Sequence, residues 1–196
     1  MGAEESPDLG SVVSHLARPV YRHHQFQGST NDCGPTSLAI AANALLGREE
    51  FAGRDVAEQM SHPTFEWHPI PHLVVPRIPG WATFPWGIVH YLRKHGFGAR
   101  WRLFGTVDRL QQNLLANRIT IVVIGEPLRW RKWRYAGWGH VKVLFGYTPG
   151  RGFLFVDPGY PRRAEDPWAA HGLFWQPEAE FGRQWRNMFR IYIEVE

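Results

Sequence analysis

A chain of 196 residues, 44% of them hydrophobic and 14% aromatic, is long enough for one domain with a substantial core and short for two. The formal net charge of +4 at pH 7 permits an acidic partner, but no nucleic-acid-binding module accompanies it, so no nucleic-acid partner is expected. The single cysteine excludes an intramolecular disulfide and any zinc site built from several cysteines.

The N-terminal stretch, residues 1–19, contains glycine, serine, proline and acidic residues and no long apolar run. It is therefore predicted to be a flexible lead-in and not a secretory signal peptide, with a single domain over residues 20–196. No segment reaches the length of a membrane-spanning helix. These features predict a soluble, cytoplasmic protein without membrane insertion, and they leave its oligomeric state open.

The only cysteine, Cys33, directly precedes a run that is typical of a helix. Pro35 suits a first helical turn, apolar residues recur on one face, and Gly47 is a typical helix stop. Cys33 therefore lies at or just before a helix N-terminus, where unpaired N–H groups favour the negatively charged thiolate. A lone cysteine is also commonly a small buried residue, so its role depends on the residues around it.

Helical periodicity predicts three further helices in the first two-thirds of the chain. They are expected over residues 53–60, over residues 83–95, and from Thr106 onward with the apolar stripe Leu110, Leu114 and Leu115.

Residues 62–80 contain five prolines, a density that predicts an ordered loop instead of a helix or a strand. This segment also carries His62, His68 and His72, together with Glu66. Their spacing matches no strong metal-binding motif, and the prolines interrupt any helix that would align them. We therefore predict neither a metal ion nor a cofactor.

The second half of the chain is typical of an antiparallel sheet. Residues 119–124 form a nearly continuous β-branched run, as in a central strand buried on both faces. Residues 141–147 and 153–156 flank a Pro/Gly turn and predict a hairpin, and residues 97–103 and 189–195 alternate like strands. Because helices come first and strands second, we predict an α+β fold, with N-terminal helices packed on a C-terminal antiparallel sheet.

Two residues at one end of this hairpin have the chemistry to assist a cysteine nucleophile. His140 begins the first strand and Asp157 follows the second, so an antiparallel hairpin brings them together. A cysteine nucleophile needs a base and a group that orients the base. We expect one His140 ring nitrogen within about 4 Å of the Cys33 sulfur and Asp157 near the other nitrogen. Alternatively, His140 is a packed strand residue and Asp157 only supplies turn chemistry.

The tetrahedral intermediate of acyl transfer also needs hydrogen-bond donors for its oxyanion. Gln27 lies six residues before Cys33, and its amide can donate into the same volume as the Cys33 backbone N–H. Gln25 is a rival, and spacing alone does not separate the two.

The combination of Gln27, Cys33-Gly34-Pro35, Gly139-His140-Val141 and Val156-Asp157-Pro158 resembles the papain-like cysteine peptidases that remove double-glycine leader peptides from bacteriocin precursors. It also resembles the bacterial proteins that carry such a domain alone, and the resemblance spans about residues 20–195. It implies a papain-like fold, Cys33 as nucleophile, His140 as general acid/base, Asp157 as its orienting residue and Gln27 in the oxyanion hole. The reaction would be acyl transfer through a thioester.

A strip of alternating basic and aromatic residues, 129–138, leads directly to His140. We assign Trp133 and Trp138 from this strip, together with Asp32, as candidate substrate-binding residues. Alternatively, the tryptophans of the strip pack against arginine stems on a solvated loop.

Three functions fit these residues. The first is a peptidase or amidase with a peptide substrate. The second is an acyltransferase or cyclase that acts on a thioester-bound biosynthetic intermediate, which a carrier protein with an acidic surface could present. The third is a peptide-binding module without catalysis, and the complete set of Cys33, His140 and Asp157 disfavours it.

Overall fold

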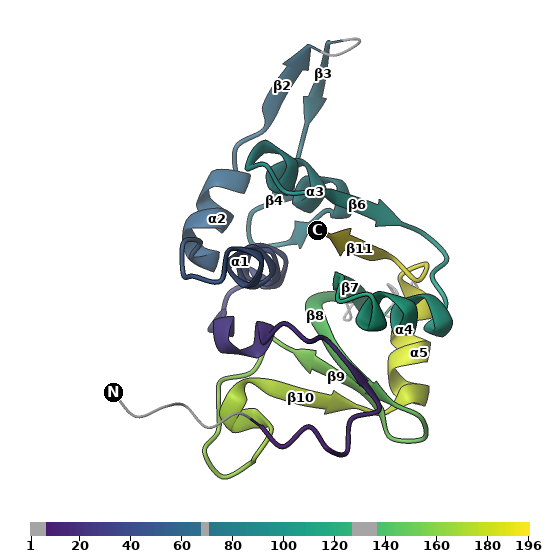
Figure 1. Cartoon of the computed structure of the whole chain (residues 1–196). Coiled ribbons are helices and arrows are strands. Elements are labelled where there is room, and N and C mark those ends of the chain that lie inside the picture. The colour runs from purple at the N-terminus through teal and green to yellow at the C-terminus, as the bar shows by residue number, and fades with distance from the viewer. Residues whose placement is uncertain (1–6, 68–70, 127–136) are drawn as a thin grey trace.

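The computed structural model describes residues 7–67, 71–126 and 137–196. Its centre is a seven-stranded antiparallel sheet in the order β10-β9-β8-β7-β11-β6, with β1 paired to β8 (Figure 1). The strands are β1 (Ser14–His15), β6 (Ala99–Arg102), β7 (Ile119–Glu126), β8 (Trp138–Thr148), β9 (Gly152–Val156), β10 (Leu173–Gln176) and β11 (Tyr192–Val195).

Five helices are described: α1 (Cys33–Leu46), α2 (Gly53–Met60), α3 (Pro85–Lys94), α4 (Val107–Leu115) and α5 (Glu178–Asn187). Helices α1, α2 and α3 gather on one side of the sheet, and α1 packs on β8, whereas α5 packs on β7 and β9 (Figure 1). The predicted α+β class is confirmed. None of these described helices has both the length and the hydropathy of a membrane span.

Helix α1 is buried from Gly34 to Ala44 because most of its side chains are small or apolar. It ends where Gly47 adopts a left-handed conformation with φ of 67°, as the sequence predicts. Its first turn lies tightly against β5 (Ala82–Thr83), since a Cβ at Gly34 would come within 2.6 Å of the Thr83 side chain. This contact holds the cysteine end of α1 against the rest of the chain.

The prediction of a loop over residues 62–80 is wrong. Strands β2 (Thr64–Trp67) and β3 (Pro71–Val74) form a hairpin that projects from the body of the protein, and β4 (Arg77–Ile78) pairs with β5 (Figure 1). Proline is tolerated as the first residue of a strand and in edge strands, because the missing N–H is not needed there. Pro71 occupies such a first position, so proline density alone was misleading.

Several smaller predictions also need correction. Leu115 is 73% exposed, whereas Leu110 and Leu114 are buried, because α4 places only two of the three leucines toward the sheet. Helix α3 begins at Pro85 instead of Thr83, since Thr83 is used by β5. The sequence patterns missed β10 and α5 altogether.

The lead-in is more ordered than predicted. Its strand β1 pairs with β8, and the flanking Val12 and Leu16 are buried. These apolar side chains belong to the core, so residues 12–16 form part of the folded unit although they precede residue 20.

Candidate active site

The N-terminus of α1 and the β8–β9 hairpin meet at a cleft with a volume of about 1260 Å³. Cys33 begins α1, His140 lies on β8, and Asp157 follows β9. All three line this cleft together with Gln27. The tertiary structure thus brings together the four residues that the sequence proposed for acyl transfer.

His140 and Asp157 form a short hydrogen-bonded pair. The His140 Nε2 lies 2.6 Å from Asp157 Oδ1, which also accepts a hydrogen bond of 2.9 Å from the Gly159 N–H. A Cβ on Gly159 would lie 3.1 Å from both Asp157 Oδ1 and His140 Cε1, so glycine lets this turn pass close to the pair. Because Nε2 is held by Asp157, Nδ1 is the ring nitrogen available to Cys33. The predicted approach of Asp157 to one ring nitrogen is therefore confirmed.

The electrostatics of the pair favour a protonated imidazole. Burial by itself would lower the pKa of His140, but hydrogen bonds with Asp157 and Cys33 and the attraction of their negative charges raise that pKa to about 9. For Asp157, burial by itself would raise the pKa. The hydrogen bond with His140 and the positive charge of His140 outweigh burial and hold the pKa of Asp157 below its usual value. His140 therefore holds, at neutral pH, a proton that it can give to a reacting group.

Gln27 and Gln25 have different roles in the structure. Gln27 lines the cleft, and its Oε1 is buried without a hydrogen-bond donor among the described residues. Its Nε2 donates to the Thr30 carbonyl at 2.7 Å. The Gln25 amide is committed to the α1–α2 connection, where it binds the Phe51 carbonyl and the Gly53 N–H at 2.8 Å each. Of the two rivals, only Gln27 lines the cleft that Cys33 also lines.

The segment before Cys33 is tied to the turn after Asp157. The Gln27 N–H donates to the Pro158 carbonyl at 2.9 Å. His24 Nε2 lies 3.0 Å from the Asp157 carbonyl and 3.1 Å from the Tyr160 carbonyl. Burial lowers the pKa of His24, which favours a neutral ring that donates one hydrogen. Sequence reasoning missed His24, because only the fold brings it to this turn.

The candidate substrate-binding residues have separate outcomes. Trp138 lines the cleft and is 44% exposed. Trp81, which the sequence did not single out, also lines the cleft and is 68% exposed. Asp32 forms an ion pair of 2.6 Å with the buried Arg77 of β4 and does not cap α1 through its side chain. Trp133 lies outside the described residues.

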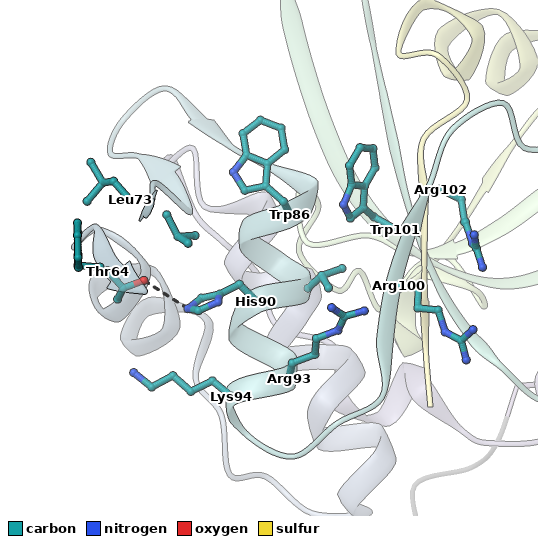
Figure 2. A pocket seen from close by; sticks show the side chains of 12 residues that line it. Thr64, Leu73, Trp86, His90, Arg93, Lys94, Arg100, Trp101 and Arg102 are labelled. Atoms are coloured by element: carbon teal, nitrogen blue, oxygen red, sulfur yellow. Dashed lines mark hydrogen bonds between the residues drawn. The ribbon is translucent and has the colours of Figure 1, made fainter. Parts of the chain in front are cut away.

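A second cleft, of about 1100 Å³, lies between the β2–β3 hairpin, α3 and β6. Figure 2 shows Trp86 and Trp101, which project from α3 and β6 and both line this cleft, and His90 pointing toward Thr64. Arg93 and Lys94 contribute positive charge, and no cysteine lines this cleft in the part of the chain that the structure describes. Nor does any group of three His, Cys, Asp or Glu residues suited to a metal ion occur within the described ranges; His68 falls outside them.

The fold has relatives among solved structures. A protein described as a C39-like peptidase from Bacillus anthracis superposes with a TM-score of 0.65 at 14% identity, over 93% of this chain and 97% of that chain. This chain has the fold of a C39-like peptidase. The peptidase domain of Streptococcus ComA, a bi-functional ABC transporter involved in a quorum-sensing pathway, superposes with a TM-score of 0.54 at 19% identity, over 87% and 95% of the two chains.

These two structures confirm the predicted papain-like fold, as it occurs in C39-like peptidases. No family model and no curated protein matches the sequence. The likeness is therefore one of fold, at low sequence identity.

Proposed function

We propose that this protein is a cysteine peptidase or amidase in which Cys33, His140 and Asp157 form a catalytic triad. The observation that carries the proposal is the 2.6 Å His140–Asp157 pair in the cleft that the N-terminus of α1 also lines. The peptidase fold of the two solved structures supports it. Together these features match the requirements of an activated cysteine nucleophile.

In the first half-reaction the Cys33 thiolate attacks the carbonyl carbon of the substrate. The developing oxyanion accepts hydrogen bonds from the Cys33 backbone N–H and from Gln27 Nε2. Gln27 Nε2 carries two hydrogens, so it can donate one to the oxyanion while the other stays bonded to the Thr30 carbonyl. The C–N bond then breaks, His140 gives its proton to the departing amine, and the acyl group stays on sulfur as a thioester.

In the second half-reaction His140, now neutral, removes a proton from water as the water oxygen bonds to the acyl carbon. The C–S bond breaks, and the imidazolium–thiolate pair is restored. Asp157 holds the ring through Nε2 in both halves, so that Nδ1 remains turned toward Cys33. An amine acceptor in place of water would make the same site an acyltransferase or a cyclase.

Exposed aromatic side chains give the cleft a wall for the acyl side of a substrate. Trp81 and Trp138 both line it, and each presents a large apolar surface beside the polar reaction centre. Such a wall suits a peptide or an acyl chain with apolar groups near the reacting carbonyl. Recognition of a carrier protein would need contacts beyond this wall.

Alkylation with iodoacetamide tests the proposal directly, because Cys33 is the only cysteine. We expect carbamidomethylation at neutral pH at least about tenfold faster than for free cysteine. A rate no faster than that of free cysteine contradicts both enzyme functions and leaves the peptide-binding module.

Substrate panels then separate the possible reactions. Wild-type protein and the Cys33→Ala variant are incubated with a peptide library and with N-acetylcysteamine thioesters, and the products are identified by mass spectrometry. Peptide cleavage that Cys33→Ala abolishes supports the peptidase. Thioester turnover without any peptide cleavage contradicts the peptidase and supports the acyltransferase or cyclase.

A further inference from the structure

A buried lysine contacts the carboxylate that orients His140. Lys142 follows His140 by two residues on β8 and is only 4% exposed. Its Nζ lies 3.7 Å from Asp157 Oδ2, whereas His140 Nε2 holds Oδ1 at 2.6 Å. Two cationic groups therefore share one buried carboxylate.

Three neighbouring elements, β10, β9 and α5, help to hold this amine. From β10, Gln176 Oε1 accepts a hydrogen bond of 2.6 Å from Lys142 Nζ. From β9, the Phe155 ring lies with its centroid 4.0 Å from Nζ. From α5, Glu180 attracts Lys142 by its charge, and its carboxylate accepts from Gln176 Nε2 at 3.3 Å. The lysine is thus the link between α5 and Asp157, and it also lines the active-site cleft.

Burial of an ammonium at this position has a cost. Desolvation lowers the pKa of Lys142 to about 8, against the opposing attraction of Asp157 and Glu180, so the amine is still mostly charged at neutral pH. An apolar side chain of similar length would pack beside Phe155 without this penalty. The cost of the buried charge suggests that its contact with Asp157 serves the reaction centre.

We propose that Lys142 is a positioning residue that limits how strongly Asp157 holds a proton on His140. This inference rests on the proposed function. In the thioester stage Cys33 carries no charge, so Asp157 is the anion that remains in contact with His140. His140 must be neutral at that stage to take a proton from water. Lys142 offsets part of the Asp157 charge and so makes the neutral ring accessible near neutral pH.

The reaction that this affects is hydrolysis of the thioester. The water oxygen bonds to the acyl carbon, the C–S bond breaks, and the water proton passes to His140. No redox change or further reactant is involved. The thiolate released from the C–S bond then pairs with the imidazolium, ready for the next substrate.

Turnover of p-nitrophenyl acetate separates the two half-reactions, because the burst of p-nitrophenolate reports acylation and the steady state reports deacylation. In Lys142→Met we expect the pH midpoint of deacylation to rise by about one unit, so that the rate below the midpoint falls about tenfold. The burst amplitude should stay as in the wild type. Lys142→Arg, which keeps the charge, should restore the wild-type midpoint.

Lys94→Met is the matched control, since Lys94 is exposed and lines the second cleft. It should leave both the burst and the midpoint unchanged. A folded Lys142→Met protein with an unchanged or lowered midpoint overturns the inference but leaves the proposed function intact. A wild-type protein without any burst overturns the proposed function and this inference with it.

Should Lys142→Met fail to fold, the wild-type chain supplies the test. In protein labelled with ¹³C at lysine Cε, the Lys142 resonance should show a step at the His140 midpoint besides the step of its own amine near pH 8, because both groups contact Asp157. The resonance that is missing in Lys94→Met belongs to Lys94 and is thereby distinguished from the Lys142 resonance. A Lys142 resonance that does not respond to the His140 titration overturns the inference.

Discussion

The two clefts differ in how far their charged groups are removed from water. In the active-site cleft, Asp157 is 2% exposed and is held by His140 and Lys142, and the pKa values of all three groups are shifted by burial and by one another. In the second cleft, Arg93 and Lys94 are exposed beside two tryptophans (Figure 2). Charged groups that are buried and paired with one another can shift each other's pKa values. Exposed charges next to aromatic rings mainly provide a surface for binding.

The largest effect should follow from Asp157→Asn. The amide keeps the shape but removes the charge that holds the proton on His140 and fixes the ring tautomer, so we expect kcat to fall about a thousandfold. It also removes the carboxylate charge next to the buried Lys142 ammonium, which should lower the free energy of unfolding by about 3 kcal/mol in urea titrations. Wild-type kcat in this variant would contradict the assignment of Asp157.

A smaller loss is expected at the oxyanion hole. Gln27→Ala should reduce kcat about a hundredfold with little change in KM, because its amide would act mainly in the transition state. Gln25→Ala is the matched control. It should leave kcat unchanged and lower the free energy of unfolding by about 1–2 kcal/mol, since it frees the Phe51 carbonyl and the Gly53 N–H. Equal kcat values in the two variants would contradict the assignment of Gln27, and not Gln25, to the oxyanion hole.

The pH dependence of amide turnover tests the His140 charge. The pKa of His140 is raised to about 9, so the ring holds its proton below that pH and loses it above. Protonation of the leaving amine should therefore fail above pH 9, and kcat/KM for an amide should drop about tenfold per further pH unit. The burst with p-nitrophenyl acetate should persist, because its leaving group needs no proton. An amide profile that already falls near pH 7 would contradict the raised pKa.

The smallest effect should come from the second cleft. Trp101→Ala removes an exposed ring from β6 and should change the iodoacetamide alkylation rate of Cys33 by less than about twofold. A larger change, in a variant with unaltered thermal unfolding, would show that the two clefts are coupled.

Local sequence patterns predicted the elements that carry their own signals. Helix α1 and its stop at Gly47, helix α2, and the β8–β9 hairpin all form where the patterns place them. The hairpin also brings His140 next to Asp157, because antiparallel pairing follows from the turn alone. Elements without such signals were missed: β3 begins at a proline, and α5 follows a segment of glycine, proline and charged residues.

Other features of the site depend on contacts between distant segments. The choice of Gln27 over Gln25 is made by hydrogen bonds to the Pro158 and Phe51 carbonyls, and no sequence spacing reports these partners. Lys142 looks like an ordinary polar residue in a strand, and only the packing of β10 and α5 around it turns it into a buried cation.

The sequence by itself therefore determined the fold class, the helix end that carries Cys33, and the neighbouring positions of His140 and Asp157. These depend on periodicity, turn residues and strand pairing over short separations. The tertiary structure alone decided which glutamine lines the cleft with Cys33, how His24 holds the Asp157 turn, and which cation shares the Asp157 carboxylate with His140. The Gln27 and His24 contacts join segments about 130 residues apart, and Lys142 is buried by the later elements β10 and α5. The energies of these contacts depend on burial that only the folded chain creates.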